Sequence, residues 1–138
     1  MKEIYITFYT KEKGKLELDK KEWFDFPDNS VTFHSECGPA VVFTDGDEMY
    51  YINGKHHREN GPAVIYTNGY RAYCINGKLH REDGPAVIHG NTGHCTYWLN
   101  DKHYPKSLYY KKLEEIDNLP LSLKLIHEEE WIRKRAKK

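Results

Sequence analysis

The sequence has few cysteines and no long apolar segment. Its three cysteines, Cys37, Cys74 and Cys95, are an odd number and form no CxxC pair. A disulfide framework is therefore not expected, and a reducing compartment is favoured. No run of about 18 apolar residues is present, as a transmembrane helix would need. The first eight residues also lack the apolar core of a signal peptide. We therefore expect a soluble cytoplasmic protein.

The sequence also lacks an excess of charge of either sign. Lys plus Arg and Asp plus Glu each number 21. No global basic field attracts nucleic acid or anionic lipid, so binding of that kind would have to be local. Aromatic residues are instead plentiful, at 14% with eleven tyrosines. Because tyrosine supplies buried area while its hydroxyl tolerates water, this composition favours thin, partly exposed β layers.

Internal repetition is the dominant pattern. Three segments with the pattern His-x-Glu-x-Gly-Pro-Ala-Val begin 23 residues apart, at His34, His57 and His80. Each is followed by a turn and a second apolar stretch, and the turn of the last copy is one residue longer. A fixed period of this kind indicates stacked supersecondary units. We expect three β-hairpin repeats over residues 31–104.

The turns predict how the hairpins pair. Asn68-Gly69 favours a two-residue type I′ turn, which would place Val64 opposite Tyr73. The same pairing in each copy gives one regular face, which we expect to form the stacked core. Its residues would be Val41, Val64, Val87, Tyr50, Tyr73, Tyr97, Ile52, Ile75 and Leu99. Asn53-Gly54 and Asn76-Gly77 should turn the chain into the next repeat.

The opposite face would hold the positions that vary between copies. Among them are Met49, Tyr51 and Trp98. Since stacking does not dictate residues that differ from copy to copy, we expect these side chains to be free to contact a partner.

The flanks predict a cap at each end of the array. Residues 3–9 and 15–26 resemble two strands around Lys13-Gly14 that would cover the first repeat. After the array, Tyr109, Leu113 and Ile116 fall at i, i+4 and i+7 of a helix, and a second helix should follow from about Pro120. We thus expect an N-terminal β-hairpin cap in residues 1–30, repeats in 31–104 and a helical tail in 105–138. The predicted fold class is mainly β with a C-terminal α-helical tail.

The repeated unit Asn-Gly-Lys-x-His-Arg-Glu-x-Gly-Pro-Ala-Val-Ile, at residues 53–65 and 76–88, resembles variants of the MORN repeat. The resemblance covers roughly half of the chain, and the copy at His34 lacks the Arg and the leading Asn-Gly. It implies a tandem antiparallel β-hairpin array. Similar units are frequent in bacterial, bacteriophage and large-DNA-virus proteins, and some MORN proteins scaffold protein complexes. The resemblance implies a shape but no catalytic residues.

The repeated histidines are the first candidates for chemistry. In a stacked array their side chains would lie on the order of 5 to 10 Å apart, whereas zinc ligands converge within about 2.1 Å of one point. We therefore favour a hydrogen bond from each histidine to a turn backbone, and expect no metal or cofactor. Cys37 and Cys95 lie near histidines, but neither an orienting Asp or Asn nor an oxyanion site can be located. No catalytic residue is expected.

Two functions from different classes remain. The first is a non-enzymatic protein-binding scaffold, which the distribution of similar repeats extends to a small phage- or virus-encoded protein that inhibits or modulates a host protein. The candidate partner-binding residues are Met49, Tyr51, Trp98, Arg58, Arg81 and Trp131. The alternative is a nucleic-acid or phosphate-ligand module that uses the His-Arg-Glu stripe and the basic C-terminus. Arg58-Glu59 and Arg81-Glu82 would otherwise form a surface ion-pair ladder between neighbouring repeats.

Overall fold

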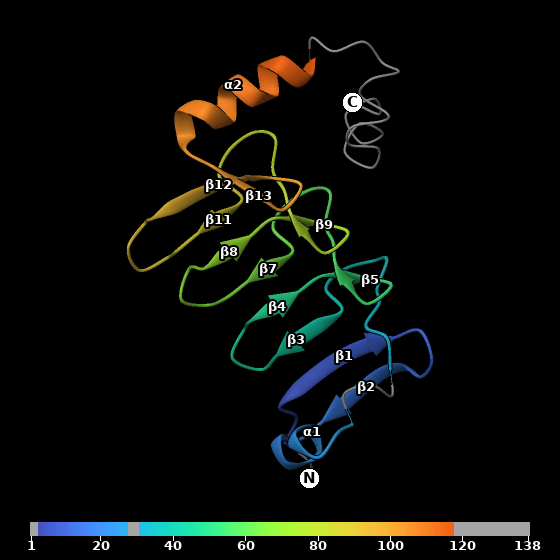
Figure 1. The fold of residues 1–138 in the computed structure, drawn as a ribbon. Helices are drawn as coiled ribbons and strands as arrows, with labels where there is room; N and C mark the ends of the chain where they lie inside the picture. Colours follow the sequence, from blue (N-terminus) through green and yellow to red (C-terminus); the bar gives the residue numbers. More distant parts are fainter. Residues whose placement is uncertain (1–2, 28–30, 118–138) are drawn as a thin grey trace.

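The fold is described from a computed structural model, in which residues 3–27 and 31–117 are described. It is mainly antiparallel β, with a nine-stranded sheet in the order β13-β12-β11-β8-β7-β4-β3-β1-β2 and two small sheets, β5-β6 and β9-β10. The hairpins follow one another from α1 to α2 (Figure 1). A mainly β fold with a helix near the C-terminus is thereby confirmed.

The elements are short. They are β1 (Ile6–Thr10), β2 (Gly14–Leu18), α1 (Lys20–Phe24), β3 (Val41–Phe43), β4 (Glu48–Met49), β5 (Tyr51–Ile52), β6 (Lys55–His56), β7 (Val64–Ile65), β8 (Arg71–Ala72), β9 (Cys74–Ile75), β10 (Lys78–Leu79), β11 (Val87–Ile88), β12 (Cys95–Leu99), β13 (Lys102–Tyr104) and α2 (Lys106–Asp117).

The N-terminal hairpin covers the first repeat, as expected, because β1 pairs with β3 and places Phe8 opposite Val41. The predicted second strand, residues 15–26, is wrong beyond Leu18. The Asp19 side chain accepts a hydrogen bond from the Glu22 N–H at 2.8 Å, and the Glu22 carboxylate accepts one from the Asp19 N–H at 3.0 Å. This capping box starts α1 directly after β2.

The first two hairpin tips have three-residue loops instead of the predicted two, and the third tip, which is one residue longer, has a four-residue loop. In the middle repeat, Val64 lies opposite Ala72, so the predicted pairing with Tyr73 is wrong by one residue. The Gly69 N–H donates to the Tyr66 carbonyl at 3.0 Å, and Gly69 has a φ of 95°. A turn closed by a left-handed glycine in this way inserts one extra residue. Because side chains alternate along a strand, the slip moves the residues of the second strand of the hairpin to the opposite face.

The corrected register gives one face a row of apolar residues that crosses the sheet. Each member lies opposite the next, in the order Phe8, Val41, Met49, Val64, Ala72, Val87 and Thr96. Met49 had been assigned to the variable face, whereas it packs against two buried clusters, and Ala72 at the equivalent position of the middle repeat is only 3% exposed. Variation between copies therefore does not mark a surface here.

The type I′ geometry occurs instead at the turns of the small sheets. Asn53 and Gly54 have φ values of 51° and 79°, and Asn76 and Gly77 have 49° and 80°. Both central residues of a type I′ turn need positive φ. These turns lead into the next repeat, as predicted.

α2 closes the other end of the array. Tyr109 and Ile116 are buried with Leu99, and Leu113 packs against them, which confirms the predicted helical face. The second predicted helix and Trp131 lie outside the described residues. No helix in the described part combines the length and apolar character needed to cross a membrane.

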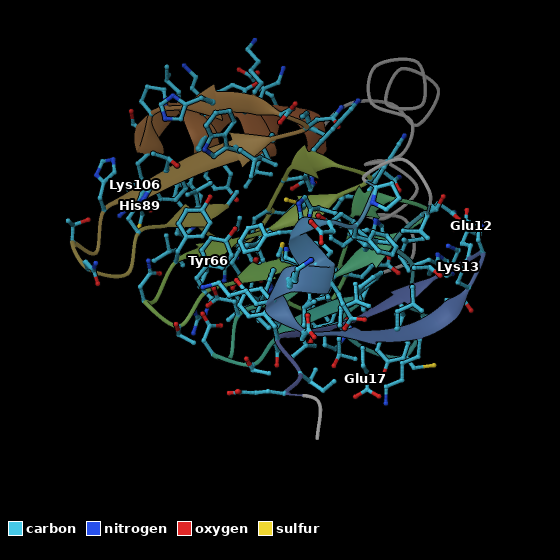
Figure 2. All side chains as sticks on the ribbon, turned by 90° about the horizontal axis from the view of Figure 1, so that it is seen from below. Glu12, Lys13, Glu17, Tyr66, His89 and Lys106 are labelled. Atoms are coloured by element: carbon cyan, nitrogen blue, oxygen red, sulfur yellow. The ribbon has the colours of Figure 1, made fainter. Side chains whose placement is uncertain are left out.

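The stack has two long edges. In the view along it, His89 lies at the edge of the hairpin tips and Glu12 and Lys13 lie at the opposite side (Figure 2). The small sheets lie away from the tips (Figure 1). Next to them run the loops that carry the repeated His-x-Glu-x-Gly motif. We call residues 35–38, 57–61 and 80–84 the loop edge.

Candidate functional site: the clefts of the loop edge

Each repeated histidine accepts a hydrogen bond from the turn backbone of the next hairpin. The N–H of Asn53 lies 2.9 Å from His34 Nδ1, that of Asn76 lies 3.0 Å from His57 Nδ1, and that of Asn100 lies 2.9 Å from His80 Nδ1. This confirms the structural role predicted for the three histidines. They connect each loop to the following turn.

His80 is the most enclosed member of this series. Its Nε2 lies 3.0 Å from Glu82 Oε2, and the two side chains are 4% and 6% exposed. Since Nδ1 accepts the Asn100 N–H, the neutral ring carries its proton on Nε2 and donates it to Glu82. Both ring nitrogens are thus engaged. This His–Glu pair fixes the loop and has no free nitrogen with which to take a proton from a substrate.

The two arginines of the loop edge stack on tyrosines. The guanidinium carbon lies 4.0 Å from the Tyr50 ring centre in Arg58 and 4.0 Å from the Tyr73 ring centre in Arg81. Such cation–π contacts contribute about 0.5–2 kcal/mol. Arg81 also pairs with Asp83 of its own repeat at 2.9 Å. The predicted ion-pair ladder between neighbouring repeats is therefore not formed by Arg81.

The stacked guanidinium groups also account for two of the three motif glycines, Gly61 and Gly84. Arg58 Nη1 donates to the Pro62 carbonyl at 3.2 Å, so the side chain folds back over its own loop. A Cβ atom added at Gly61 would lie 3.1 Å from Arg58 Cζ, and one at Gly84 would lie 3.1 Å from Arg81 Cζ. The glycine thus leaves room for the arginine that precedes it by three positions.

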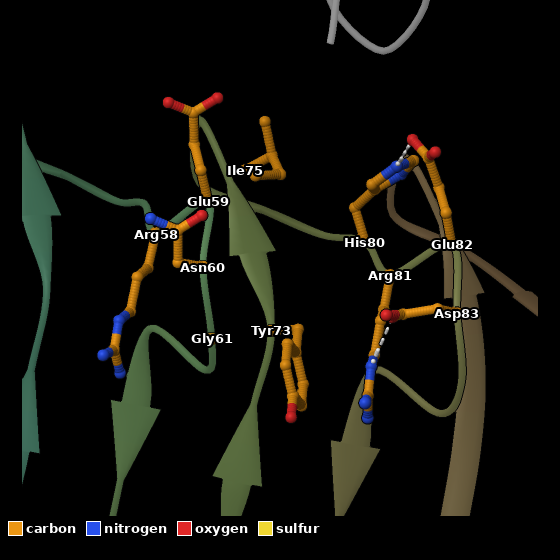
Figure 3. Close-up of a pocket in the computed structure, with 10 residues that line it drawn as sticks. All are labelled: Arg58, Glu59, Asn60, Gly61, Tyr73, Ile75, His80, Arg81, Glu82 and Asp83. Atoms are coloured by element: carbon orange, nitrogen blue, oxygen red, sulfur yellow. Dashed lines mark hydrogen bonds and ion pairs between the residues drawn. The ribbon is translucent and has the colours of Figure 1, made fainter. Parts of the chain in front are cut away.

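Successive loops enclose two equivalent clefts. The first, of about 370 Å³, lies between residues 35–38 and 57–60 and is also lined by Tyr50 and Ile52. The second, of about 360 Å³, lies between residues 58–61 and 80–83 and is also lined by Tyr73 and Ile75 (Figure 3). Both volumes fall within the roughly 300–1,000 Å³ of ordinary ligand pockets. The same loop therefore serves two neighbouring clefts.

The lining of the second cleft carries more negative than positive charge. Arg58 and Arg81 stand against Glu59, Glu82 and Asp83. Both guanidinium groups already lie on tyrosine rings and donate to carbonyls, at 3.2 Å to Pro62 and 3.0 Å to Pro85. The cleft is suited to hydroxyl groups or cations more than to anions.

The structure brings Arg58 and Arg81 together in the second cleft but places the other candidates elsewhere. Met49 and Tyr51 pack against the cluster around Phe8. Tyr51 stacks on His56 at 4.3 Å, and burial raises the pKa of its hydroxyl. Trp98 lies on β12, where its Nε1 donates to Thr96 Oγ1 at 2.8 Å. None of the three lines either cleft, and Trp131 lies outside the described residues.

The tyrosines and Asn60 of the clefts were missed as site residues. Tyr50 and Tyr73 were assigned to the core, yet both line a cleft, and Asn60 lines both clefts. The signal that could have identified them is the period itself. Any concave surface between two copies must occur again one repeat along.

Two of the three cysteines have surroundings that lower the reactivity of a thiol or hold it in a hydrogen bond. Burial raises the pKa of the Cys74 thiol to about 11. The Cys95 thiol donates to the Gly93 carbonyl at 3.2 Å. Within residues 3–27 and 31–117, no three His, Cys, Asp or Glu side chains gather as they would to hold a metal ion.

Comparison with protein-family models, curated proteins and solved structures finds no match to this chain. The case for its function is therefore carried by its own repeats and by the clefts between them.

Proposed function

We propose that the chain is a non-enzymatic, MORN-like hairpin-repeat scaffold that binds a protein partner along the loop edge. One observation carries this proposal: two clefts of nearly equal size lie one repeat apart and share Arg58, Glu59 and Asn60. A partner that follows the loop edge meets the same chemistry twice. Two side chains inserted one repeat apart would be enclosed within the clefts, as the anchor residues of protein interfaces commonly are.

The geometry gives less support to phosphate or nucleic-acid binding. The arginines of the His-Arg-Glu stripe are committed to Tyr50 and Tyr73, and carboxylates outnumber them in the second cleft. Salt separates the two functions, because phosphate binding weakens steeply between low and moderate salt. A partner held in enclosed clefts keeps most of its affinity over that range.

Affinity capture with matched variants tests the scaffold function. Asn60→Trp places a bulky ring in both clefts from an exposed loop position, whereas Asn91→Trp adds the same ring at an exposed hairpin tip. We expect tagged wild type and Asn91→Trp to retain the same partner from cells of the native source, and Asn60→Trp to lose it. Capture of one partner by all three proteins would contradict binding along the loop edge.

A Tyr51→Ala, Trp98→Ala double variant tests the remaining candidates. Tyr51 packs on Phe33 with the ring centres 5.2 Å apart, so the folded fraction must be measured first. We expect the folded double variant to keep the partner. Loss of the partner at full folding would move the interface to the sheet.

A further inference from the structure

The array ends in a third cleft of the same kind, and this one is filled. Tyr109 of α2 is 0% exposed, and its ring centre lies 4.9 Å from that of Tyr97. Its hydroxyl donates to the Arg81 carbonyl at 2.5 Å and accepts from the Gly84 N–H at 3.2 Å. Leu99 belongs to the same buried cluster. Four residues of the last repeat thus receive one tyrosine.

The four equivalent residues line each open cleft. Arg81, Gly84, Tyr97 and Leu99 correspond by the repeat spacing to Arg58, Gly61, Tyr73 and Ile75 in the second cleft, and to Ser35, Gly38, Tyr50 and Ile52 in the first. In the described part of the chain, neither the Gly61 N–H nor the Arg58 carbonyl forms a hydrogen bond. The acceptor and donor that hold the Tyr109 hydroxyl are therefore repeated and open.

We propose that each open cleft binds a tyrosine side chain presented by a short helix of a partner protein, in the manner of Tyr109. The phenol hydroxyl donates to the Arg58 carbonyl and accepts from the Gly61 N–H, and the ring enters beside Tyr73, whose ring also carries the Arg81 guanidinium at 4.0 Å. This assignment rests on the proposed scaffold function and names the chemistry of the partner at the same site.

The charge of the cleft bears on the residues directly beside the tyrosine. α2 has Lys111 and Lys112 directly after its paired tyrosines, and its acidic residues, Glu114, Glu115 and Asp117, follow farther along the helix. An open cleft with Glu59, Glu82 and Asp83 in its lining favours the same arrangement. A phosphorylated tyrosine should not bind, for two reasons. The same carboxylates repel the phosphate, and phosphorylation removes the hydroxyl proton that would be donated to the Arg58 carbonyl.

The test uses α2 as its own probe. A peptide of residues 104–117 is locked as a helix by a lactam between Lys111 and Glu115, which are both exposed on α2. The lactam neutralises Lys111 and leaves Lys112 as the charged residue near the tyrosines. It is titrated into the isotope-labelled full chain, and the amide signals of Gly38 and Gly61 are followed by NMR. We expect saturable shifts at both glycines. Phe in place of the tyrosine at 109 should weaken binding about tenfold, because the donor and acceptor in the cleft lose their partner. Phosphotyrosine there should abolish it.

Protein variants locate the binding. Asn60→Trp should lose both sets of shifts and Asn91→Trp should keep them. No saturation at millimolar peptide, equal affinity of the Phe and Tyr peptides, or unchanged binding to Asn60→Trp would each overturn the tyrosine assignment. The scaffold function is contradicted by a separate observation, namely that Asn60→Trp captures the same partner as the wild type. If Asn60→Trp loses the captured partner while the peptide does not bind to the wild type, the scaffold function is supported and only the tyrosine assignment is contradicted.

Discussion

His34, His57 and His80 each accept a hydrogen bond from a turn backbone, but their surroundings differ in burial. His34 lies 3.6 Å from an exposed Glu36, whereas His80 lies 3.0 Å from a buried Glu82. His34→Ala should cost about 1 kcal/mol, the ordinary worth of one hydrogen bond. His80→Ala should cost about 3 kcal/mol or more, because it also leaves the Glu82 carboxylate buried without that partner. Urea unfolding of both variants checks the order, and equal costs would contradict it.

The cysteines are also expected to differ in reactivity because they differ in burial. Cys37 is exposed and Cys74 is buried. Because the thiolate is the reactive species, iodoacetamide at pH 8 should modify Cys37 in the folded chain and reach Cys74 only on unfolding. Mass spectrometry of the digested protein, with and without urea, gives the two rates. Comparable rates without urea would show that Cys74 is accessible.

Burial of Cys74 also predicts a pH dependence of stability. Its pKa rises from 9.0 to about 11 in the folded state. A group whose pKa is raised on folding contributes its stability fully below the unfolded pKa, and that stability is lost as pH rises through the folded pKa. The chain should thus lose on the order of 2–3 kcal/mol between pH 9 and 11 from this thiol. Cys74→Ala should show a smaller loss over the same range, measured by urea unfolding at each pH.

At the scale of the element, the hairpin tips pack closely. A Cβ atom added at Gly90 would lie 2.2 Å from the Asn68 carbonyl oxygen and 2.3 Å from Gly69 Cα, so the tips of two neighbouring hairpins would have to separate. Gly90→Ala should therefore lower the free energy of unfolding by about 1–3 kcal/mol. Gly38→Ala is the control, because its Cβ would meet nothing within 4 Å. The melting temperatures of the two variants should differ clearly, and a neutral Gly90→Ala would show that the tips can move apart.

The sequence predicted where the hairpins lie but not how they pair. Asn-Gly occurs both at the hairpin tip, Asn68-Gly69, and at the connecting turn, Asn53-Gly54. Only the second adopts the type I′ form, since a left-handed glycine can also close a three-residue loop. The same dipeptide therefore occurs in loops of two lengths that differ by one residue. This difference of one residue changes the register and so determines which side chains are buried. Likewise, the alternation of residues 15–26 concealed a capping box that depends on two side chains, Asp19 and Glu22.

The candidate site was predicted in part. Arg58 and Arg81 were identified because they recur in the motif, and both line the second cleft. The clefts were not predicted, because a concavity between two copies depends on how far apart the loops stack. Met49 illustrates the opposite error: it varies between copies, and yet it lies opposite Val64 in the buried row.

At the scale of the whole molecule, the connections from one repeat to the next are repeated in kind. The His57 ring binds the Asn76 turn as the His80 ring binds the Asn100 turn, and Arg58 covers Tyr50 as Arg81 covers Tyr73. In such an array, stability is approximately a sum over units and their nearest-neighbour interfaces. A further copy of the repeat should therefore form the same histidine and arginine contacts with the repeats on either side of it.

We expect the chain to accept a duplicate of residues 57–79 inserted after Leu79. The duplicate begins at the position equivalent to His80, so every connection between loop and turn is preserved, and one more cleft is formed. The longer protein should remain folded, with a melting temperature equal to or above that of the parent. A control that inserts the same 23 residues in shuffled order should unfold at lower temperature, because it supplies neither the histidine nor the glycine turns. If both insertions lowered the melting temperature equally, the repeats would not be interchangeable, and the equivalent clefts would no longer be expected to share one kind of occupant.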